Sequence, residues 1–578
     1  MTATSTLNHE IEQAAREWTQ EPFDEKTRAE VADMLENDHT LLNECFYTSL
    51  EFGTGGLRGI MGAGTNRVNR YTIGLATQGL ATYLLAHYPD QKVSVAIAYD
   101  SRNNSPFFAR VSAEVLSANG IYVYLFDELR PTPELSFAVR HLGCQSGIVV
   151  TASHNPPEYS GYKVYWADGG QVIAPHDKGI IDEVRNTTIF NVNFEANESL
   201  IHSIGADVDQ AYLEQMKEYC LSPEAIEEEK DLKIVFTGLH GTGITMVPPA
   251  LANLGFDNVH LVPEQDIPDG NFPTVESPNP EEAQALKMGL DMCKQLDADI
   301  LLGTDPDADR VGLAAKNADG EWALLNGNQA GSILVYYHLK RWSELGKLNG
   351  KQFVAKTIVT TDLIEKIAKS YGVKIYNTLT GFKFIAERIK ALEGDETFIT
   401  GGEESYGYLV GDKVRDKDAV ISSALFCEIA AWAKTQGMTL IDLMEEIYAE
   451  HGHYMEALVS VKKEGMAGKA EISSMMSALR KSPPSELAGS EVICFIDCDA
   501  QKLFDLKEGT QSSTGLPASN VLQFLTADGS RVTARPSGTE PKIKFYFSVN
   551  QSLGELTIGE SEVDLNEKIT RLKAELGV

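Results

Sequence analysis

The chain has 578 residues and should form several domains, because a domain usually holds about 100–200 residues. Its formal net charge of −33 argues against nucleic acid and anionic membranes as partners, and no run of about 18 apolar residues is present to span a bilayer. The seven cysteines are scattered without a CxxC pair, so we expect reduced thiols and a cytoplasmic protein.

The first segment, residues 1–45, is predicted to be an amphipathic helical extension packed on the first domain. It mixes acidic and basic residues from the start and has no apolar stretch, so no signal peptide is expected.

One pattern then recurs three times: a lysine and an apolar strand, a helical stretch, a glycine and a second strand, and finally a short apolar strand that runs into a polar loop. The strands that open each copy lie in 92–102, 232–241 and 351–362, and the closing strands with their loops lie in 146–156, 298–310 and 396–407. Such alternation predicts parallel sheets with helices on both faces, in which ligands bind beyond the carboxyl ends of the strands.

We therefore predict three similar doubly wound α/β domains and a smaller C-terminal α+β domain. The expected boundaries are 46–205, 206–325, 326–452 and 453–578. Each domain presents one loop with the residue types of a phosphate or metal site.

The loop of the first domain contains Ser153 and His154, with Lys163 shortly after them. A serine on the turn after a strand, beside a base and a cation, suits a covalent phosphoryl carrier. The same residues also suit a helix cap and a turn. The loop is no G-x-S-x-G elbow, so a hydrolase triad has little support.

The loop of the second domain, DPDADR, places Asp305, Asp307 and Asp309 at alternate positions, followed by Arg310. Three carboxylates at this spacing can converge on one hard cation such as Mg²⁺. An EF-hand is excluded, because its sixth and twelfth positions hold Arg310 and Lys316 instead of Gly and Glu. A solvated acidic turn is the alternative.

The third loop, GGEESYG, contributes Glu403 and Ser405, which can accept hydrogen bonds from vicinal sugar hydroxyls. Upstream of it lies the segment from Thr380 to Lys383, and Arg415 lies in a basic stretch downstream. All three stretches could instead be solvated surface.

The fourth loop, RPSGTEPK, combines an arginine fork, two hydroxyls and a glycine, which together form a nest for an anion. A simple turn is the alternative, and the pattern is not a Walker loop. Its candidate residues, with the arginine of the separate FGTGGLRG segment, are Arg535, Ser537, Gly538, Thr539 and Arg58.

Four such loops in this order, at domain-sized spacing, resemble the signature loops of the α-D-phosphohexomutase superfamily, the phosphoglucomutases and phosphomannomutases. The resemblance runs from about residue 45 to residue 550. It implies a four-domain, heart-shaped molecule with the active site at its centre. Many glucose-specific members have DGDGDR in the metal loop. The version DPDADR, the FGTGGLRG segment and the length resemble the long branch that includes phosphopentomutases, whereas GGEESYG resembles the glucose-type loop.

The resemblance also implies roles. Ser153 would be the phosphoserine, with Arg58, His154 and Lys163 near the transferred group, and the three aspartates would hold one Mg²⁺ with a phosphoserine oxygen. Substrate would be bound by the residues of the remaining loops, namely Arg310, Thr380, Gly381, Lys383, Glu403, Ser405, Arg415, Arg535, Ser537, Gly538 and Thr539.

The implied reaction exchanges glucose 1-phosphate and glucose 6-phosphate, with glucose 1,6-bisphosphate as intermediate and activator. Phosphopentomutase or phosphomannomutase activity is the alternative, and a monomer or weak homodimer with a small phosphosugar substrate is expected. Two other classes remain open: a haloacid-dehalogenase-type phosphatase with Asp307 as nucleophile, and a non-catalytic phosphosugar-binding protein.

Overall fold

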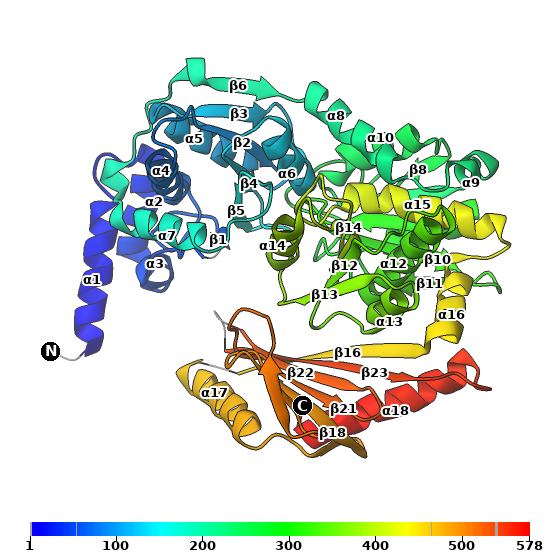
Figure 1. The fold of residues 1–578 in the computed structure, drawn as a ribbon. Coiled ribbons are helices and arrows are strands. Elements are labelled where there is room, and N and C mark those ends of the chain that lie inside the picture. Colours follow the sequence, from blue (N-terminus) through cyan, green and yellow to red (C-terminus); the bar gives the residue numbers. More distant parts are fainter. Residues whose placement is uncertain (1–2, 54, 464, 538–540) are drawn as a thin grey trace. The chain divides into compact units, whose positions relative to one another are not determined.

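The computed structural model describes residues 3–53, 55–463, 465–537 and 541–578 (Figure 1). Its backbone contacts divide the chain into two units. The first unit comprises the chain up to residue 314 together with 389–391 and 407–432, and the second comprises 315–388, 392–406 and 433–578.

Three helices open the first unit: α1 (Ala3–Glu17), α2 (Glu25–Asn37) and α3 (His39–Phe46). The side chain of Asp24 caps α2 by accepting from Thr27 N, and that of Asp38 caps α3 by accepting from Leu41 N. The helices share a core in which Trp18 stacks on Phe23 with ring centroids 4.5 Å apart.

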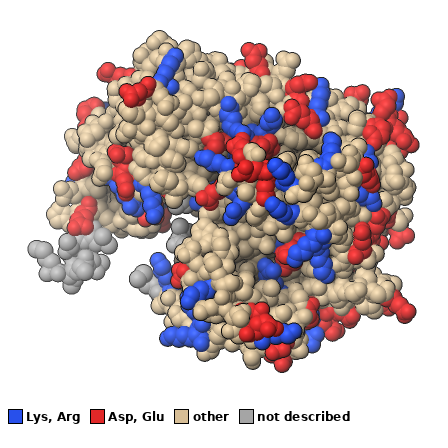
Figure 2. All heavy atoms as spheres, in the orientation of Figure 1, with Lys and Arg blue, Asp and Glu red and all other residues tan. Residues whose placement is uncertain are grey.

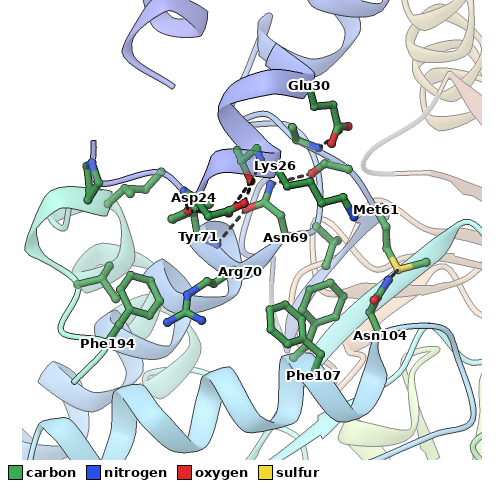
Figure 3. A pocket seen from close by; sticks show the side chains of 18 of the residues that line it. Asp24, Lys26, Glu30, Met61, Asn69, Arg70, Tyr71, Asn104, Phe107 and Phe194 are labelled. Carbon is green, nitrogen blue, oxygen red and sulfur yellow. Dashed lines mark hydrogen bonds between the residues drawn. The ribbon is translucent and has the colours of Figure 1, made fainter. Parts of the chain in front are cut away.

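A cavity of about 660 Å³ lies between this helical layer and the first sheet domain. Figure 3 shows Arg70, Phe107 and Phe194 on its walls. Its described lining includes none of the residues that the sequence nominates for catalysis or binding. This larger cavity is therefore separate from the site described below.

The first sheet has the strand order β1-β5-β4-β2-β3-β6. Strands β2, β3, β4 and β6 are parallel, and β5 and β1 extend the sheet as an antiparallel edge. Its strands are β1 (Gly56–Ile60), β2 (Ser94–Tyr99), β3 (Tyr122–Phe126), β4 (Ser146–Val150), β5 (Tyr159–Trp166) and β6 (Ile201–Ile204). Its helices are α4 (Arg70–His87), α5 (Ser105–Ala118), α6 (Thr132–His141) and α7 (His176–Asn186), with short 3₁₀ turns η1 (Ile189–Asn191) and η2 (Glu198–Leu200).

Both faces of this sheet are covered. Phe108 of α5 packs with Ile97 and Ile148 on one face. On the other face α6 approaches so closely that a side chain at Gly147 would meet Val139. Every residue of β4 is therefore buried, which explains why the strand reads as a continuous apolar run.

The rest of the first unit is built on a second parallel sheet, in which β7 pairs with both β8 and β9. The strands are β7 (Ile234–Thr237), β8 (Val259–Leu261), β9 (Ile300–Thr304) and β10 (Val311–Lys316), whose last residues belong to the second unit. The helices are α8 (Ala206–Met216), α9 (Pro223–Glu228), α10 (Gly243–Leu254) and α11 (Lys287–Leu296), with the 3₁₀ turn η3 (Lys217–Tyr219). Strand β15 (Gly407–Val410) and most of α15 (Ala419–Thr435) also belong to this unit.

The second unit contains a third parallel sheet, in which β12 pairs with β13 and β14. These strands are β12 (Gln352–Thr357), β13 (Lys374–Thr378) and β14 (Thr397–Glu403), and β11 (Trp322–Leu325) precedes them in the chain. The helices are α12 (Gly327–Glu344), α13 (Leu363–Ser370), α14 (Phe382–Leu392), part of which belongs to the first unit, and α16 (Leu440–His451).

An antiparallel sheet in the order β16-β23-β22-β21-β18-β19-β20 closes the chain. The buried residues Phe524 and Phe547 of this sheet share a core with Ile472 of α17 and Leu565 of α18. The strands are β16 (His453–Lys462), β17 (Glu486–Leu487), β18 (Ser490–Asp497), β19 (Lys502–Asp505), β20 (Thr510–Ser513), β21 (Leu522–Thr526), β22 (Arg531–Pro536) and β23 (Lys542–Gln551), and the helices are α17 (Gly465–Lys481) and α18 (Ile558–Leu576).

The predicted fold class is confirmed. The three copies of the sequence pattern form parallel sheets with one strand order, β3-β2-β4, β8-β7-β9 and β13-β12-β14. In each copy the predicted polar loop leaves the carboxyl end of the third strand. The seven cysteines, all within the described residues, form no disulfide bond. Within the described part of the chain, no helix is both long enough and apolar enough to cross a bilayer.

Candidate active site

The serine loop follows β4, and Ser153 adopts an unusual backbone conformation there. Its φ of 52° lies in the left-handed region, which costs a non-glycine residue about 1–2 kcal/mol. The loop holds this conformation partly because Ser153 N donates to Thr151 Oγ1 at 2.8 Å. The side chain is almost fully enclosed, with 4% of the residue exposed.

The hydroxyl of Ser153 lies between two groups that can take its proton. It donates to Asp305 Oδ2 at 2.8 Å, and its Oγ is 3.1 Å from His154 Nδ1. Burial, together with the nearby Arg310 and Arg58, lowers the pKa of His154 to about 3, so the imidazole is neutral at pH 7. The serine oxygen therefore has both a carboxylate and a neutral base at hydrogen-bond distance.

The three aspartates of the second loop form a compact, buried group. One carboxylate oxygen from each of Asp305, Asp307 and Asp309 lies within 4.8 Å of the others. Asp305 Oδ1 accepts the backbone N–H groups of Asp309 and Arg310, both at 3.1 Å.

Two oxygens of this group are buried and unsatisfied. Among the described residues, no nitrogen donor lies within hydrogen-bond distance of Asp307 Oδ1 or Asp309 Oδ1, and Arg310 Nε lies 3.8 Å from Asp309 Oδ1. A buried polar atom without a partner is costly, and carboxylate oxygens are the ligands that a hard divalent cation prefers. The donor set thus fits a metal ion of the Mg²⁺ type.

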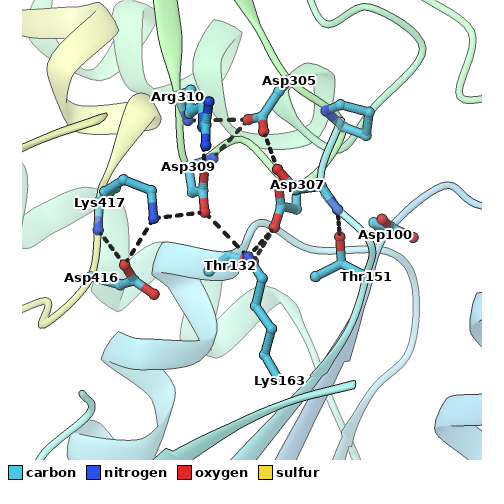
Figure 4. Close-up of polar contacts among 12 residues, drawn as sticks. Asp100, Thr132, Thr151, Lys163, Asp305, Asp307, Asp309, Arg310, Asp416 and Lys417 are labelled. Carbon is cyan, nitrogen blue, oxygen red and sulfur yellow. Dashed lines mark hydrogen bonds and ion pairs between the residues drawn. The ribbon is translucent and has the colours of Figure 1, made fainter. Parts of the chain in front are cut away.

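Two lysines reach the same carboxylates from different elements, as Figure 4 shows. Lys163 Nζ on β5 lies 2.7 Å from Asp307 Oδ2 and 3.2 Å from Asp309 Oδ2. Lys417 Nζ, from the loop before α15, lies 3.0 Å from Asp309 Oδ2. These lysines place positive charge directly beside the carboxylates.

The lysines also make the pKa values of the three carboxyl groups differ. Burial and the neighbouring carboxylates Asp307 and Asp309 raise the pKa of Asp305 well above its usual value. Burial also raises the pKa values of Asp307 and Asp309, but the neighbouring lysines have the larger effect. Lys163 lowers the pKa of Asp307, and Lys417 together with Lys163 lowers that of Asp309, so both values lie below the usual range.

A cavity of about 290 Å³ opens beside the serine and the metal loop. Four cationic side chains line it together with Ser153, namely Arg58, Lys163, Arg310 and Lys417. In Figure 2 one group of acidic side chains on the visible face is ringed by Lys and Arg, while other acids are scattered. Positive charge is thus concentrated locally, as an anionic substrate requires of so acidic a chain.

Both arginines of this cavity lining contact other side chains. Arg58 on β1 donates to Asn155 Oδ1 at 2.9 Å, which ties it to the serine loop. Arg310 forms an ion pair with Glu281 at 2.6 Å. Arg415, in contrast, is 1% exposed, donates from Nε to Asp412 O at 2.9 Å, and is not among the described residues that line the cavity.

In the second unit, the structure brings two predicted binding segments together. Glu403, the last residue of β14, accepts at Oε1 from Gly381 N at 2.9 Å. Thr380 lies in the same bend as Gly381, Lys383 lies in the first turn of α14, and Ser405 follows two residues after Glu403. The neighbouring Glu404 accepts from Thr360 Oγ1 at 3.1 Å.

The fourth loop is described only in part. Arg535 lies on β22 opposite Lys544, and Ser537 N donates to Lys542 O at 2.7 Å. The predicted residues Gly538 and Thr539 lie outside the described residues.

Sequence reasoning did not nominate two residues that contact the aspartates. Lys417 lies in the basic stretch around Arg415, and a functional lysine could have been sought there. Thr132, the first residue of α6, donates from Oγ1 to Asp307 Oδ2 at 3.0 Å. Nothing in the sequence near Thr132 signals this contact.

Family models match four consecutive stretches of the chain. They are described as phosphoglucomutase/phosphomannomutase alpha/beta/alpha domains I, II and III and the C-terminal domain, and they match residues 49–189, 210–320, 326–451 and 499–556.

Curated relatives named phosphoglucomutase cover most of the chain. One from Staphylococcus epidermidis is 39% identical over 508 residues, or 87% of this chain and 91% of the relative. One from Staphylococcus haemolyticus is 37% identical over 522 residues, which cover 90% of this chain and 94% of the relative.

Solved structures share the fold. A putative phosphomannomutase from Thermus thermophilus aligns with a TM-score of 0.65 and 24% identity over 90% of this chain and 99% of its own. The open form of parafusin, a phosphoglucomutase from Paramecium, aligns with a TM-score of 0.67 and 17% identity. The alignment covers 90% of this chain and 94% of parafusin.

Proposed function

Because the chain belongs to the phosphoglucomutase/phosphomannomutase family and is therefore a phosphosugar mutase, we propose that it interconverts glucose 1-phosphate and glucose 6-phosphate through a phosphorylated Ser153. One observation carries the proposal: Ser153 Oγ lies 2.8 Å from Asp305 Oδ2, at the rim of three buried carboxylates and in a cavity lined by four cations.

In the proposed cycle, a free hydroxyl of the hexose monophosphate attacks the phosphorus of phospho-Ser153. The bond from phosphorus to the serine oxygen breaks, and the sugar becomes glucose 1,6-bisphosphate. The bisphosphate then turns end for end, its other phosphoryl group returns to Ser153, and the isomeric monophosphate leaves. Free glucose 1,6-bisphosphate would load a serine that has lost its phosphoryl group.

The residues around Ser153 have separate tasks in this cycle. A phosphoserine carries about −1.5 to −2 charges at pH 7, so Arg58, Lys163 and Arg310 would neutralise the group during transfer. His154, neutral at pH 7, is placed to exchange a proton with the serine oxygen.

The metal proposed here is one Mg²⁺, held by Asp305, Asp307 and Asp309 with an oxygen of the phosphoserine. When bound, it would neutralise charge on the phosphoryl group. The two unsatisfied buried carboxylate oxygens support this assignment.

The other predicted loops would bind the rest of the substrate. We assign sugar hydroxyls to Glu403 and Ser405, and the non-reacting phosphate to the fourth loop. The other substrate-binding residues proposed are those that the resemblance implies, namely Arg310, Thr380, Gly381, Lys383 and Arg415. Arg415 is buried and does not line the described cavity. A cytoplasmic monomer or weak homodimer is the expected state.

Pentose phosphate is the second candidate substrate. The metal loop carries Ala308, with a φ of 49°, where the glucose-type sequence DGDGDR has glycine. A comparison of kcat/KM for glucose 1-phosphate, ribose 1-phosphate and mannose 1-phosphate tests the assignment. A ribose value more than about tenfold above the glucose value would overturn it.

The phosphoenzyme tests the chemistry. Wild-type protein incubated with Mg²⁺ and glucose 1,6-bisphosphate should gain one phosphoryl group by intact mass, on Ser153 by peptide mapping. The ester should survive hydroxylamine. A phosphoryl group that hydroxylamine removes would indicate an aspartyl phosphate and would favour Asp307 as nucleophile.

A further inference from the structure

A buried arginine that the proposed cycle does not use lies directly behind the serine loop. Arg102 follows β2, and its side chain is fully enclosed. Its guanidinium donates to four backbone carbonyl oxygens of one loop: to Pro156 O at 2.8 Å, to Tyr159 O at 3.0 Å, and to Ser153 O and Asn155 O.

Arg102 supplies hydrogen-bond donors to the buried carbonyl groups of the serine loop. Buried carbonyl groups need donors, and the planar guanidinium can serve several at fixed angles, which the single ammonium of lysine cannot. Ser153 also holds a strained backbone conformation, and such conformations persist only where the surroundings impose them. Arg102 binds the carbonyl of the strained residue itself.

The orientation of Arg102 is fixed from its own side by Asp100. Asp100 Oδ2 lies 3.4 Å from Arg102 Nε, and Asp100 Oδ1 accepts from Arg102 N at 3.0 Å and from Ser105 Oγ at 2.7 Å. Both side chains of the ion pair are fully buried. The guanidinium therefore has little freedom to release the loop.

The opposite side of Arg102 meets the domain that carries the metal loop. The ring of Phe272, itself 1% exposed, lies with its centroid 5.0 Å from Arg102 Cζ. At Gly270 the two backbones approach so closely that an added Cβ would lie 2.3 Å from Asn103 N and 2.7 Å from the carbonyl carbon of Arg102. Arg102 thus contacts both the serine loop and the segment that follows β8.

We propose that Arg102 is a positioning residue for phosphoryl transfer, which holds the carrier serine in register with the metal-binding aspartates. The inference rests on the proposed function. On this proposal, Arg102 maintains the 2.8 Å distance between Ser153 Oγ and Asp305 Oδ2 by holding the serine loop in place, although Arg102 contacts neither atom. Its loss should impair transfer to and from Ser153 and leave sugar binding nearly unchanged.

The main test is Arg102→Lys, which keeps the charge but cannot bind four carbonyls. The matched control is Arg67→Lys. Arg67 is also buried, donates to the carbonyls of Glu44 and Asn66 at 3.2 Å, and pairs with the Glu44 side chain at 3.4 Å, among the N-terminal helices. Both changes remove guanidinium hydrogen bonds to backbone carbonyls, four at Arg102 and two at Arg67, but only Arg102→Lys affects the serine loop.

We expect Arg102→Lys to lower kcat by at least about 100-fold with KM within threefold, because displacement by about 1 Å in a transfer site has that effect. The rate at which glucose 1,6-bisphosphate loads Ser153, followed by intact mass, should fall by the same factor. Arg67→Lys should retain both rates within threefold. All rates are corrected for the folded fraction measured by circular dichroism.

Hydrogen–deuterium exchange gives a readout that needs no activity. In unphosphorylated protein, Arg102→Lys should speed exchange in peptides covering 151–159, and Arg67→Lys should not. Gly270→Ala is a second variant, because its added methyl group must push the segment after β8 away from Arg102. It should also slow loading of Ser153 while Arg102 itself stays intact.

The outcomes separate the two proposals. Wild-type protein that acquires no phosphoserine refutes the proposed function, and the exchange experiment still decides whether Arg102 orders the loop. If wild type is loaded and both Arg102→Lys and Gly270→Ala are loaded within threefold of its rate, the inference is overturned. It is also overturned if Arg67→Lys loses as much activity as Arg102→Lys, or if exchange in 151–159 is unchanged.

Discussion

Replacing Lys163 with methionine tests how the buried carboxylates are balanced. Lys163 is 14% exposed and contacts Asp307 at 2.7 Å and Asp309 at 3.2 Å. Removing one partner of a buried ion pair usually costs about 3–5 kcal/mol, because the other charge is left uncompensated. Lys417 continues to pair with Asp309, so we expect the lower end, about 3 kcal/mol, in metal-free protein.

The same substitution should strengthen metal binding. Lys163 pairs with the Oδ2 atoms of two carboxylates that would also hold a divalent cation, so the lysine and the metal ion would repel each other. Removing one positive charge at ion-pair distance is worth on the order of 1–2 kcal/mol after solvent screening, which corresponds to roughly tenfold tighter Mg²⁺ binding. Saturating Mg²⁺ should therefore recover much of the lost stability, while turnover falls by at least about 100-fold because the transferred group loses a cation.

Two measurements check this reasoning: urea unfolding of the first unit with chelator or with Mg²⁺, and isothermal titration with Mg²⁺. The control is Lys390→Met, which removes a surface ion pair with Asp168 at 2.7 Å in which the lysine is about half exposed. It should change stability by no more than about 1 kcal/mol and leave Mg²⁺ affinity unchanged. Lys163→Met protein that is as stable as wild type without metal, or that binds Mg²⁺ more weakly, would refute the argument.

Three further outcomes are expected. Asp309→Asn should weaken Mg²⁺ binding by at least about 100-fold in titration calorimetry, and a loss below tenfold would contradict its role as a ligand. Burial raises the pKa of Cys144 and Cys498 to about 11 and that of Cys220 to about 12, so these thiols should resist iodoacetamide at pH 8 in native protein, and rapid alkylation seen by mass spectrometry would contradict this. Burial raises the pKa of Glu456 to about 7, so the folded state holds a proton that the unfolded state has lost between about pH 4.5 and 7. The stability that protonated Glu456 contributes is fully present below about pH 4.5 and is lost as the pH rises to about 7. Glu456→Gln should abolish that fall, about 3 kcal/mol in urea unfolding, and an unchanged pH profile would argue against it.

The fold could be predicted from the sequence because burial on both faces leaves a simple signature. Strands such as β4 and β9 have no exposed residue, so each reads as a short apolar run that ends abruptly in polar residues. The order of these runs, repeated three times, sufficed to predict parallel sheets and to place the candidate loops at the carboxyl ends of strands.

Contacts between distant segments could not be predicted in the same way. Ser153 taken alone suits a helix cap, and its proximity to Asp305 depends on how two domains pack. Lys417 looked like part of a solvated basic stretch, yet its ammonium is buried against Asp309. Arg102 looked like the end of a strand, because its role depends on carbonyl groups, which every residue has and no sequence pattern marks.

The common strand order of the three parallel sheets has a consequence for how this chain can vary. In each copy the residues proposed for the chemistry lie on the loop after the third strand, whereas the strands and helices behind it form the buried core. Exposed residues of these loops can therefore be exchanged between relatives with little effect on folding, as long as the strand ends and the buried ion pairs stay in place. The proposed carrier, metal ligands and sugar-binding residues lie on separate loops, so a new substrate preference could arise within the third loop while the other two loops keep their residues.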